Sequence, residues 1–242
     1  MKQNETRFTF MQILEGLEGI VIIVACYLSF FLKPLRERWG LSKEEASRSL
    51  PGDEIISAPK SKFTHAVKIN APKEYVWPWI AQIGQGRGGF YSYEALENLI
   101  GLQIYNSDNV LPEYQNTTLG DTVAFGPGDS LPIVICEHGH AMAIENSLDL
   151  DNNQLYDPKG SLPKNYLHLS WLWYVEALDD EHSRFISRNR VDYGPSFKSK
   201  LMFGPLTEPV VFAMDRKMCL GIKKRAERLY RQRPNLVKEE SI

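Results

Sequence analysis

The side chains best suited to contact a ligand lie on two consecutive segments in which apolar and polar residues alternate. Residues 167–178 and 184–193 are rich in aromatic and β-branched side chains, and the short acidic stretch between them predicts a β-hairpin. Because successive side chains of a strand point to opposite faces, Trp171 and Trp173 share one face. Both are candidate ligand contacts, and ordinary core packing is the alternative interpretation.

Two arginines of the second segment extend this candidate site. A turn centred on residues 180–181 pairs Trp173 with Arg188 and Trp171 with Arg190 across the hairpin. Each cation–π pair is worth about 0.5 to 1 kcal/mol when exposed, and a guanidinium group can hold the anionic end of a ligand. We therefore predict that Arg188 and Arg190 lie beside the tryptophans, although a shift of one residue in the register would undo the pairing.

The last part of the chain predicts a long amphipathic helix. Thr207 is a good N-cap, and apolar residues follow it at spacings of three and four. Met214 and Met218 belong to that apolar stripe and are candidate ligand contacts from the helix, again with core packing as the alternative. From 215 to 233 the segment carries eight basic residues and two acids, which is typical either of a solvated face or of contact with anionic lipid headgroups. The apolar positions are Val211, Met214, Met218, Ile222, Ala226 and Leu229.

The spacing of three glycines matches the sequence pattern of a dinucleotide-binding loop. Gly84, Gly86 and Gly89 have the required spacing, but Pro78 lies in a predicted helix before them, where the motif needs a strand. The glycines are better explained by a tight reversal between two short helices. We expect no nucleotide cofactor.

Cys136, His138 and His140 would place three metal ligands on one face of a continuous strand. Glu137 and Gly139 instead predict a turn, which breaks that shared face. We therefore expect no metal site.

Two titratable residues, Glu97 and His168, could act as acid–base groups in a cavity, but the sequence assigns no role to either. No nucleophile elbow or phosphate-binding loop occurs in the sequence. The catalytic residues are therefore unknown at this stage.

Composition favours one folded body. The chain has 242 residues, 43% of them hydrophobic, and a net charge of −2. This balance provides no chain-wide basic field, so nucleic acid is not an expected partner. Three widely separated cysteines favour a reducing compartment over a disulfide framework.

The N-terminal region differs from that average. Residues 8–32 contain no Lys or Arg, and 25 residues at about 1.5 Å each can cross a hydrocarbon core of roughly 30 Å. Glu15 and Glu18 interrupt the apolar run, so an interfacial or core-packed helix is the alternative to a single-pass anchor. A lipoprotein processing box ending at Cys26 is the third option, but the apolar run continues past it.

Basic residues are more frequent after this segment than before it, which predicts that the C-terminal body lies on the cytoplasmic side of a cell membrane. The residues compared are Lys33, Arg36, Arg38 and Lys43 after it, and Lys2 and Arg7 before it.

The predicted element order is a strand, two short helices, several antiparallel strands and a long C-terminal helix. This is the α+β plan of the helix-grip fold, a curved sheet wrapped around the last helix. The stretches THAVKINAPKEYVWPWIAQIGQGRGGFYSYEALENLIGL and LSKEEASRSLPGDEII resemble the SRPBCC superfamily (START, polyketide cyclase and birch-pollen-allergen-like proteins), the second in its bacterial, often membrane-anchored members. The predicted divisions are an anchor at 1–38, a linker at 39–60, the helix-grip domain at 61–232 and a polar tail at 233–242.

The resemblance implies that the domain binds a lipid-like, polyketide-like or aromatic small molecule in a cavity between sheet and helix. The superfamily includes both enzymes and plain binders. We expect a membrane-tethered binder with no chemistry of its own. A cyclase- or hydratase-like enzyme and a protein-interaction module without a ligand are the alternatives.

Overall fold

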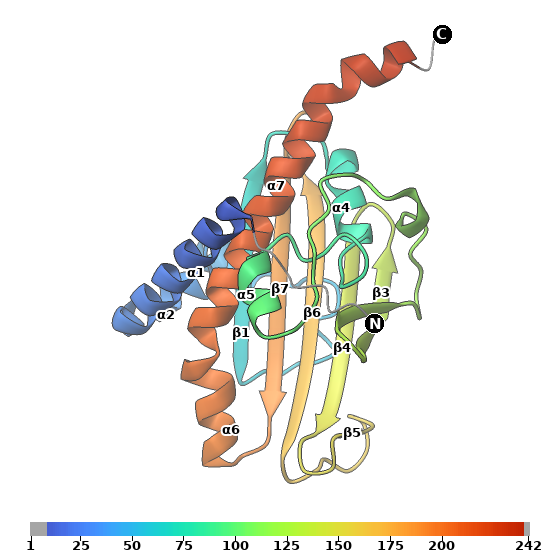
Figure 1. Cartoon of the computed structure of the whole chain (residues 1–242). Helices are drawn as coiled ribbons and strands as arrows, with labels where there is room; N and C mark the ends of the chain where they lie inside the picture. The colour runs from blue at the N-terminus through green and yellow to red at the C-terminus, as the bar shows by residue number, and fades with distance from the viewer. Residues whose placement is uncertain (1–8, 240–242) are drawn as a thin grey trace, which may run out of the picture.

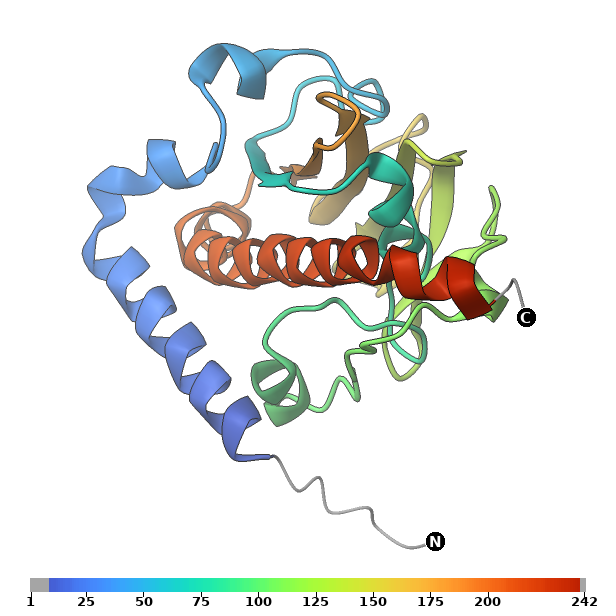
Figure 2. The ribbon, with the colours of Figure 1, turned by 90° about the horizontal axis from the view of Figure 1, so that it is seen from above.

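The computed structural model describes residues 9–239, with side chains as far as Arg233. It is an α+β structure in which a curved antiparallel sheet packs against a long C-terminal helix (Figures 1 and 2). The predicted helix-grip plan is therefore confirmed.

Seven strands form the sheet, in the order β1-β7-β6-β4-β3-β2, with the short β5 paired to β4. All of the pairs are antiparallel. The strands are β1 (Ser61–Ile69), β2 (Thr122–Gly126), β3 (Asp129–Glu137), β4 (Ala141–Asp149), β5 (Gln154–Leu155), β6 (Tyr166–Ala177) and β7 (Ser183–Tyr193).

The helices precede, interrupt and follow the sheet. The long helix α7 crosses its inner face and reaches Glu239, so most of the predicted tail at 233–242 continues this helix (Figure 1). The others are α1 (Phe10–Leu28), η1 (Phe30–Leu32), α2 (Lys33–Arg36), α3 (Lys43–Ser47), η2 (Lys73–Tyr75), α4 (Trp77–Ala81), α5 (Glu94–Leu99), η3 (Pro112–Tyr114), α6 (Phe197–Leu201) and η4 (Met202–Leu206), followed by α7 (Glu208–Glu239).

The main core lies between the inner face of the sheet and α7. Trp173, Val175 and Phe185 project from β6 and β7 and are fully buried. Met218 and Ile222 of α7 meet them, as the three- and four-residue spacing of its apolar stripe predicts. The two-residue alternation of the strands and the three- and four-residue spacing of the helix therefore place opposing apolar surfaces in contact.

The register of the β6–β7 hairpin differs from the prediction by one residue. Trp171 pairs with Asn189 and Trp173 with Ser187, whereas Arg188 pairs with Leu172. Five residues connect the strands, so the turn centres on one residue rather than between two. A shift of one residue transfers every side chain of the second strand to the other face. The predicted pairing of tryptophans with arginines is therefore wrong.

Arg188 lies on the outer face of the sheet, where the chain before β1 covers it. Its side chain is 1% exposed, and Nη1 donates to Asp53 Oδ2 at 2.6 Å. Further donations go to the carbonyl oxygens of Arg48 and Ala46, each at 3.0 Å. Arg190 donates to Asp53 Oδ1 at 3.1 Å and to the carbonyl oxygen of Ile56 at 2.8 Å. Both arginines therefore hold the preceding segment onto the sheet.

The segment 39–60, predicted as a linker, is thus part of the folded body. Leu41, Ala46 and Leu50 pack on the outer face of the sheet against residues such as Leu172 and Ile186. It forms a second, smaller core, which its polar composition concealed.

Helix α1 lies beside α7 and α5, outside the sheet (Figure 2). Gly16 and Gly19 face the body, and a Cβ added at Gly19 would lie 2.8 Å from Leu96 and 2.9 Å from Tyr93. The small residues therefore let the helix approach closely.

Ion pairs also join the N-terminal region to α7. Lys217 Nζ lies 3.1 Å from Glu15 Oε1 and 3.4 Å from Glu18 Oε2, and Arg36 pairs with the buried Glu208 at 2.8 Å. The two acids that interrupt the apolar run are therefore paired with a cation of the body.

The glycine motif forms the tight reversal expected between two short helices, α4 and α5. Gly84 and Gly89 form an antiparallel bridge, and Gly84, Gly86 and Gly89 all have positive φ angles, of 131°, 73° and 77°. Such angles favour glycine.

Candidate ligand-binding site

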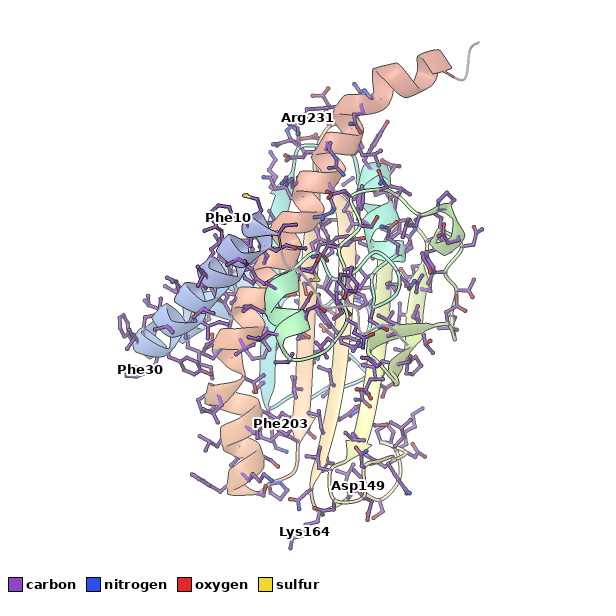
Figure 3. All side chains as sticks on the ribbon, viewed as in Figure 1. Phe10, Phe30, Asp149, Lys164, Phe203 and Arg231 are labelled. Atoms are coloured by element: carbon purple, nitrogen blue, oxygen red, sulfur yellow. The ribbon has the colours of Figure 1, made fainter. Side chains whose placement is uncertain are left out.

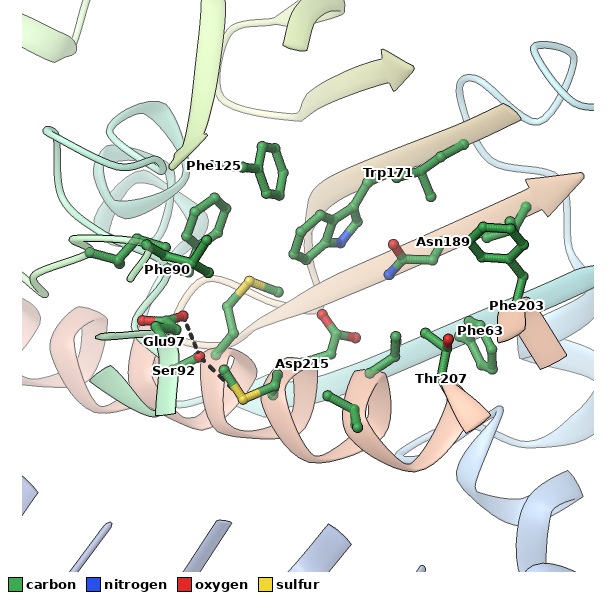
Figure 4. Close-up of a pocket in the computed structure, with 18 of the residues that line it drawn as sticks. Phe63, Phe90, Ser92, Glu97, Phe125, Trp171, Asn189, Phe203, Thr207 and Asp215 are labelled. Atoms are coloured by element: carbon green, nitrogen blue, oxygen red, sulfur yellow. Dashed lines mark hydrogen bonds between the residues drawn. The ribbon is translucent and has the colours of Figure 1, made fainter. Parts of the chain in front are cut away.

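A cavity of about 370 Å³ lies between the inner face of the sheet and α7 (Figure 4). This volume is within the usual range for small-molecule sites, roughly 300 to 1,000 Å³. The lining side chains come from the strands, from the 90–104 region, and from η4 and α7. They are Phe63, Phe90, Ser92, Glu97, Leu102, Ile104, Phe125, Leu167, Leu169, Trp171, Asn189, Val191, Phe203, Thr207, Val210, Val211, Met214, Asp215 and Met218.

Alternation along β6 and β7 positions the floor of the cavity. Leu167, Leu169 and Trp171 point inward from β6, and Asn189 and Val191 point inward from the paired positions of β7. The cavity floor is therefore set by the observed register.

Aromatic rings form one end of the cavity. Phe90 stacks on Trp171, with ring centroids 5.9 Å apart and planes inclined by 6°. Phe125 lies against both rings, at 4.8 Å from Phe90 and 5.9 Å from Trp171. These contacts make a rigid apolar wall.

Glu97 of α5 is one of the few polar side chains that line the cavity (Figure 4). It is 5% exposed, Ser92 Oγ donates to its Oε1 at 2.7 Å, and its buried Oε2 has no partner among the described atoms. Burial raises the pKa of Glu97 to about 7, the Ser92 hydrogen bond opposes this shift, and the Glu94 charge adds to it. Glu97 can therefore exchange a proton near neutral pH.

Asp215 of α7 also faces the cavity, but its oxygens are already engaged. Oδ2 contacts Nδ1 of the buried His65, and Ser187 Oγ donates to Oδ1 at 2.7 Å. Trp171 Nε1 in turn donates to Ser187 Oγ at 2.8 Å. This chain of hydrogen bonds fixes the Trp171 ring and satisfies the Asp215 carboxylate.

The structure brings together three of the six residues predicted to bind a ligand. Trp171, Met214 and Met218 line the cavity. Trp173 lies one layer deeper in the core, fully buried and 4.9 Å from Trp171 between ring centroids.

The structure contradicts the prediction that Arg188 and Arg190 lie beside the tryptophans in the ligand site. They point to the outer face of the sheet and bind Asp53, so neither lines the cavity. A ligand in the cavity cannot use them for an anionic group.

Sequence reasoning missed Asp215 and Asn189, and it named Glu97 only as an unassigned acid–base candidate. A signal for Asp215 was present, because it lies on the same helical face as Val211 and Met218, where a polar residue is unusual. Asn189 could be placed only with the correct register.

The chain turns between β3 and β4, as predicted, and each of the three possible metal ligands there has another partner. Cys136 Sγ and His138 Nε2 both contact the carbonyl oxygen of Thr117, while His140 Nε2 lies 2.7 Å from Lys73 Nζ. Among the side chains that the structure describes, residues 9–233, no group of three His, Cys, Asp or Glu is placed to hold a metal ion.

No family model and no curated relative matches the sequence. Similar solved structures include the Zhui aromatase/cyclase from Streptomyces sp. R1128, which is 14% identical with a TM-score of 0.32 over 69% of this chain and 94% of that chain. Truncated norcoclaurine synthase from Thalictrum flavum is 14% identical with a TM-score of 0.37 over 68% and 91%. The KanY protein is 13% identical with a TM-score of 0.39 over 70% and 99%. At these values the similarity extends to the fold alone.

Proposed function

We propose that this protein binds a hydrophobic or amphipathic small molecule in the cavity between the sheet and α7. The observation that carries this proposal is the cavity itself, about 370 Å³ in volume and lined mainly by aromatic, leucine, valine and methionine side chains. Its few polar groups are the usual means of orienting a ligand in an apolar site. The resemblance of the sequence to the SRPBCC superfamily agrees with such a role.

Filling the cavity is expected to abolish binding. In Leu169→Trp the larger ring would occupy the floor of the cavity, whereas Leu155 on β5 is 72% exposed, so Leu155→Trp is a matched control outside it. Native mass spectrometry of the full chain, released from mild detergent, should detect a co-purified small molecule on the wild type and on Leu155→Trp but not on Leu169→Trp. An adduct that persists on Leu169→Trp would contradict the assignment to this cavity.

Catalysis is the second candidate function, and Glu97 is the observation that favours it. A buried carboxyl group with a pKa of about 7 inside a ligand cavity is suited to transfer protons near neutral pH. A cyclase- or hydratase-like reaction would then require Glu97, and Glu97→Gln would abolish turnover of a bound substrate while the fold is kept.

Attachment to a membrane is the second part of the proposal. One helix among residues 9–239, α1, is long and apolar enough to cross a membrane, a test that signal sequences and core helices also pass. Its outward face is apolar, with Leu17 and Val21 exposed by 53% and 67%. Phe10 and Phe30, near its two ends, project away from the body (Figure 3).

The packing of α1 supports attachment in the plane of the membrane interface. A single-pass span, which the sequence favours, would have to break the contacts of Gly16 and Gly19 and the pairs of Lys217 with the two glutamates. An in-plane helix keeps all of these contacts and places only its outer face in lipid. The cytoplasmic location predicted from the flanking charges applies to a spanning helix, and one of those charges, Arg36, is paired with Glu208 inside the protein.

Two charges on the outer face of α1 are expected to release the protein from membranes. The double variant Leu17→Glu/Val21→Glu should remain with the unbound protein in a vesicle flotation assay, whereas the wild type floats. The same changes at exposed leucines of the body, Leu155→Glu/Leu162→Glu, serve as the control. Wild-type protein should also be extracted by alkaline carbonate, and resistance to carbonate would indicate a span instead.

A further inference from the structure

We propose that the cavity selects an amphiphile whose polar end carries a hydroxyl group, and that it rejects carboxylates. This inference rests on the proposed ligand-binding function and narrows it to a chemical class. It is carried by two buried polar side chains of the lining and by the charges that accompany them.

Two buried polar atoms of the lining have no partner among the described residues. Glu97 Oε2 is one, and Asn189 Nδ2 is the other, on side chains that are 5% and 6% exposed. A buried polar atom without a hydrogen bond costs about 1 to 3 kcal/mol, so a ligand that satisfies it gains affinity. Both side chains line the cavity (Figure 4).

The two atoms require complementary partners. The Asn189 amide nitrogen donates and therefore needs an acceptor on the ligand, whereas an ionised Glu97 accepts and needs a donor. A hydroxyl group is both donor and acceptor, and it also suits a protonated Glu97, which donates. A carboxylate cannot donate to Glu97, and an ammonium group cannot accept from Asn189.

Charge gives a second, independent argument. Among the described residues that line the cavity there is no Lys, Arg or His, while two acids, Glu97 and Asp215, are present. The imidazole of His65 contacts Asp215 from behind the lining and does not itself line the cavity. A buried carboxylate ligand would therefore lie among acids with no cation to pair with it, which is strongly unfavourable.

The remaining wall suits the apolar part of such a molecule. Phe63, Phe90, Phe125, Trp171 and Phe203 supply flat aromatic surfaces around the cavity. A long-chain or ring alcohol would place its carbon skeleton against these rings and a hydroxyl group at Glu97 or at Asn189.

The test compares two ten-carbon probes, 1-decanol and decanoate, by isothermal titration calorimetry at pH 8. The full chain is kept in amphipol, with amphipol alone as the blank. We expect 1-decanol to bind at least about tenfold more tightly than decanoate. Glu97→Gln should lower the ratio of the decanoate dissociation constant to the 1-decanol dissociation constant by about tenfold, because it removes a repelling charge. Glu113→Gln, at an exposed residue, should leave this ratio as in the wild type.

The outcomes separate this inference from the function on which it rests. Decanoate binding as tightly as 1-decanol would overturn the inference and leave a ligand-binding cavity. The same ratio of the two dissociation constants in Glu97→Gln as in the wild type would also overturn it. Failure of both probes to bind the wild type would count against the binding function as well.

Discussion

Replacing Arg188 with alanine is expected to lower the free energy of unfolding by about 3 to 5 kcal/mol, the usual cost of removing one partner of a buried ion pair. The guanidinium group is 1% exposed and binds Asp53, Thr64 and the carbonyl oxygens of Arg48 and Ala46. Its removal deprives Thr64 and the two carbonyl oxygens of this donor, leaves Asp53 with its hydrogen bonds from Arg190 and the Leu50 N–H, and loosens the 39–60 segment. Denaturant unfolding of the full chain at pH 7 measures the effect.

Arg184 offers a matched control on the same strand and the same face. Its side chain is 24% exposed and pairs with Glu45 at 2.6 Å near the surface. Surface pairs contribute about 0 to 1 kcal/mol, so Arg184→Ala should change the stability little. Equal small losses in both variants would show that Arg188 does not hold the outer segment in place.

Glu97 is expected to make stability fall as the pH rises from 5 to 8. Burial raises its pKa from 4.5 to about 7, so between these values the folded protein holds a proton that the unfolded chain has released. The stabilisation is complete below pH 4.5 and is lost by pH 7 and above. A shift of this size corresponds to about 3 kcal/mol.

Denaturant unfolding at a series of pH values, compared with Glu97→Gln, isolates this contribution. The wild type should lose about 3 kcal/mol relative to Glu97→Gln between pH 5 and 8, because glutamine does not titrate. Glu113→Gln should follow the wild type. Parallel pH profiles for the wild type and Glu97→Gln would mean that Glu97 ionises as freely in the folded state as in the unfolded one.

The element order and the two opposing apolar surfaces could be predicted because each follows from a local periodicity. Alternation places Trp171 and Trp173 on one face of β6, and three- and four-residue spacing places Met214 and Met218 on one face of α7. Those patterns decide which side chains point inward. Trp171, Met214 and Met218 accordingly line the cavity, and their contact with a ligand stays a prediction.

The hairpin register could not be predicted, because it depends on the connection between the strands. Leu178 N donates to the His182 carbonyl oxygen at 2.9 Å and closes a turn of five residues, whereas the prediction assumed a turn centred between two residues. This single difference moves Arg188 and Arg190 to the outer face and brings Asn189 to the cavity. The expectation that Arg188 and Arg190 hold an anionic group of the ligand depended on the incorrect register.

The outer segment and the cavity acids were missed for a different reason. Residues 39–60 are polar enough to be typical of a linker, and their few apolar side chains are buried only because the sheet has an open outer face. Asp215 belongs to a network with His65 and Ser187, which lie far from it in the sequence. Such long-range contacts leave no periodic signal.

The central claim, that the cavity between sheet and α7 receives an apolar ligand, is tested most directly by methionine-methyl NMR of the full chain during addition of 1-decanol. Met214 and Met218 line the cavity, Met142 is buried in the core away from it, and Met202 is on the surface. We predict that the Met214 and Met218 methyl resonances shift in a saturable manner while those of Met142 and Met202 do not. Saturable shifts confined to Met202 or Met142, or no shift at all, would contradict the account.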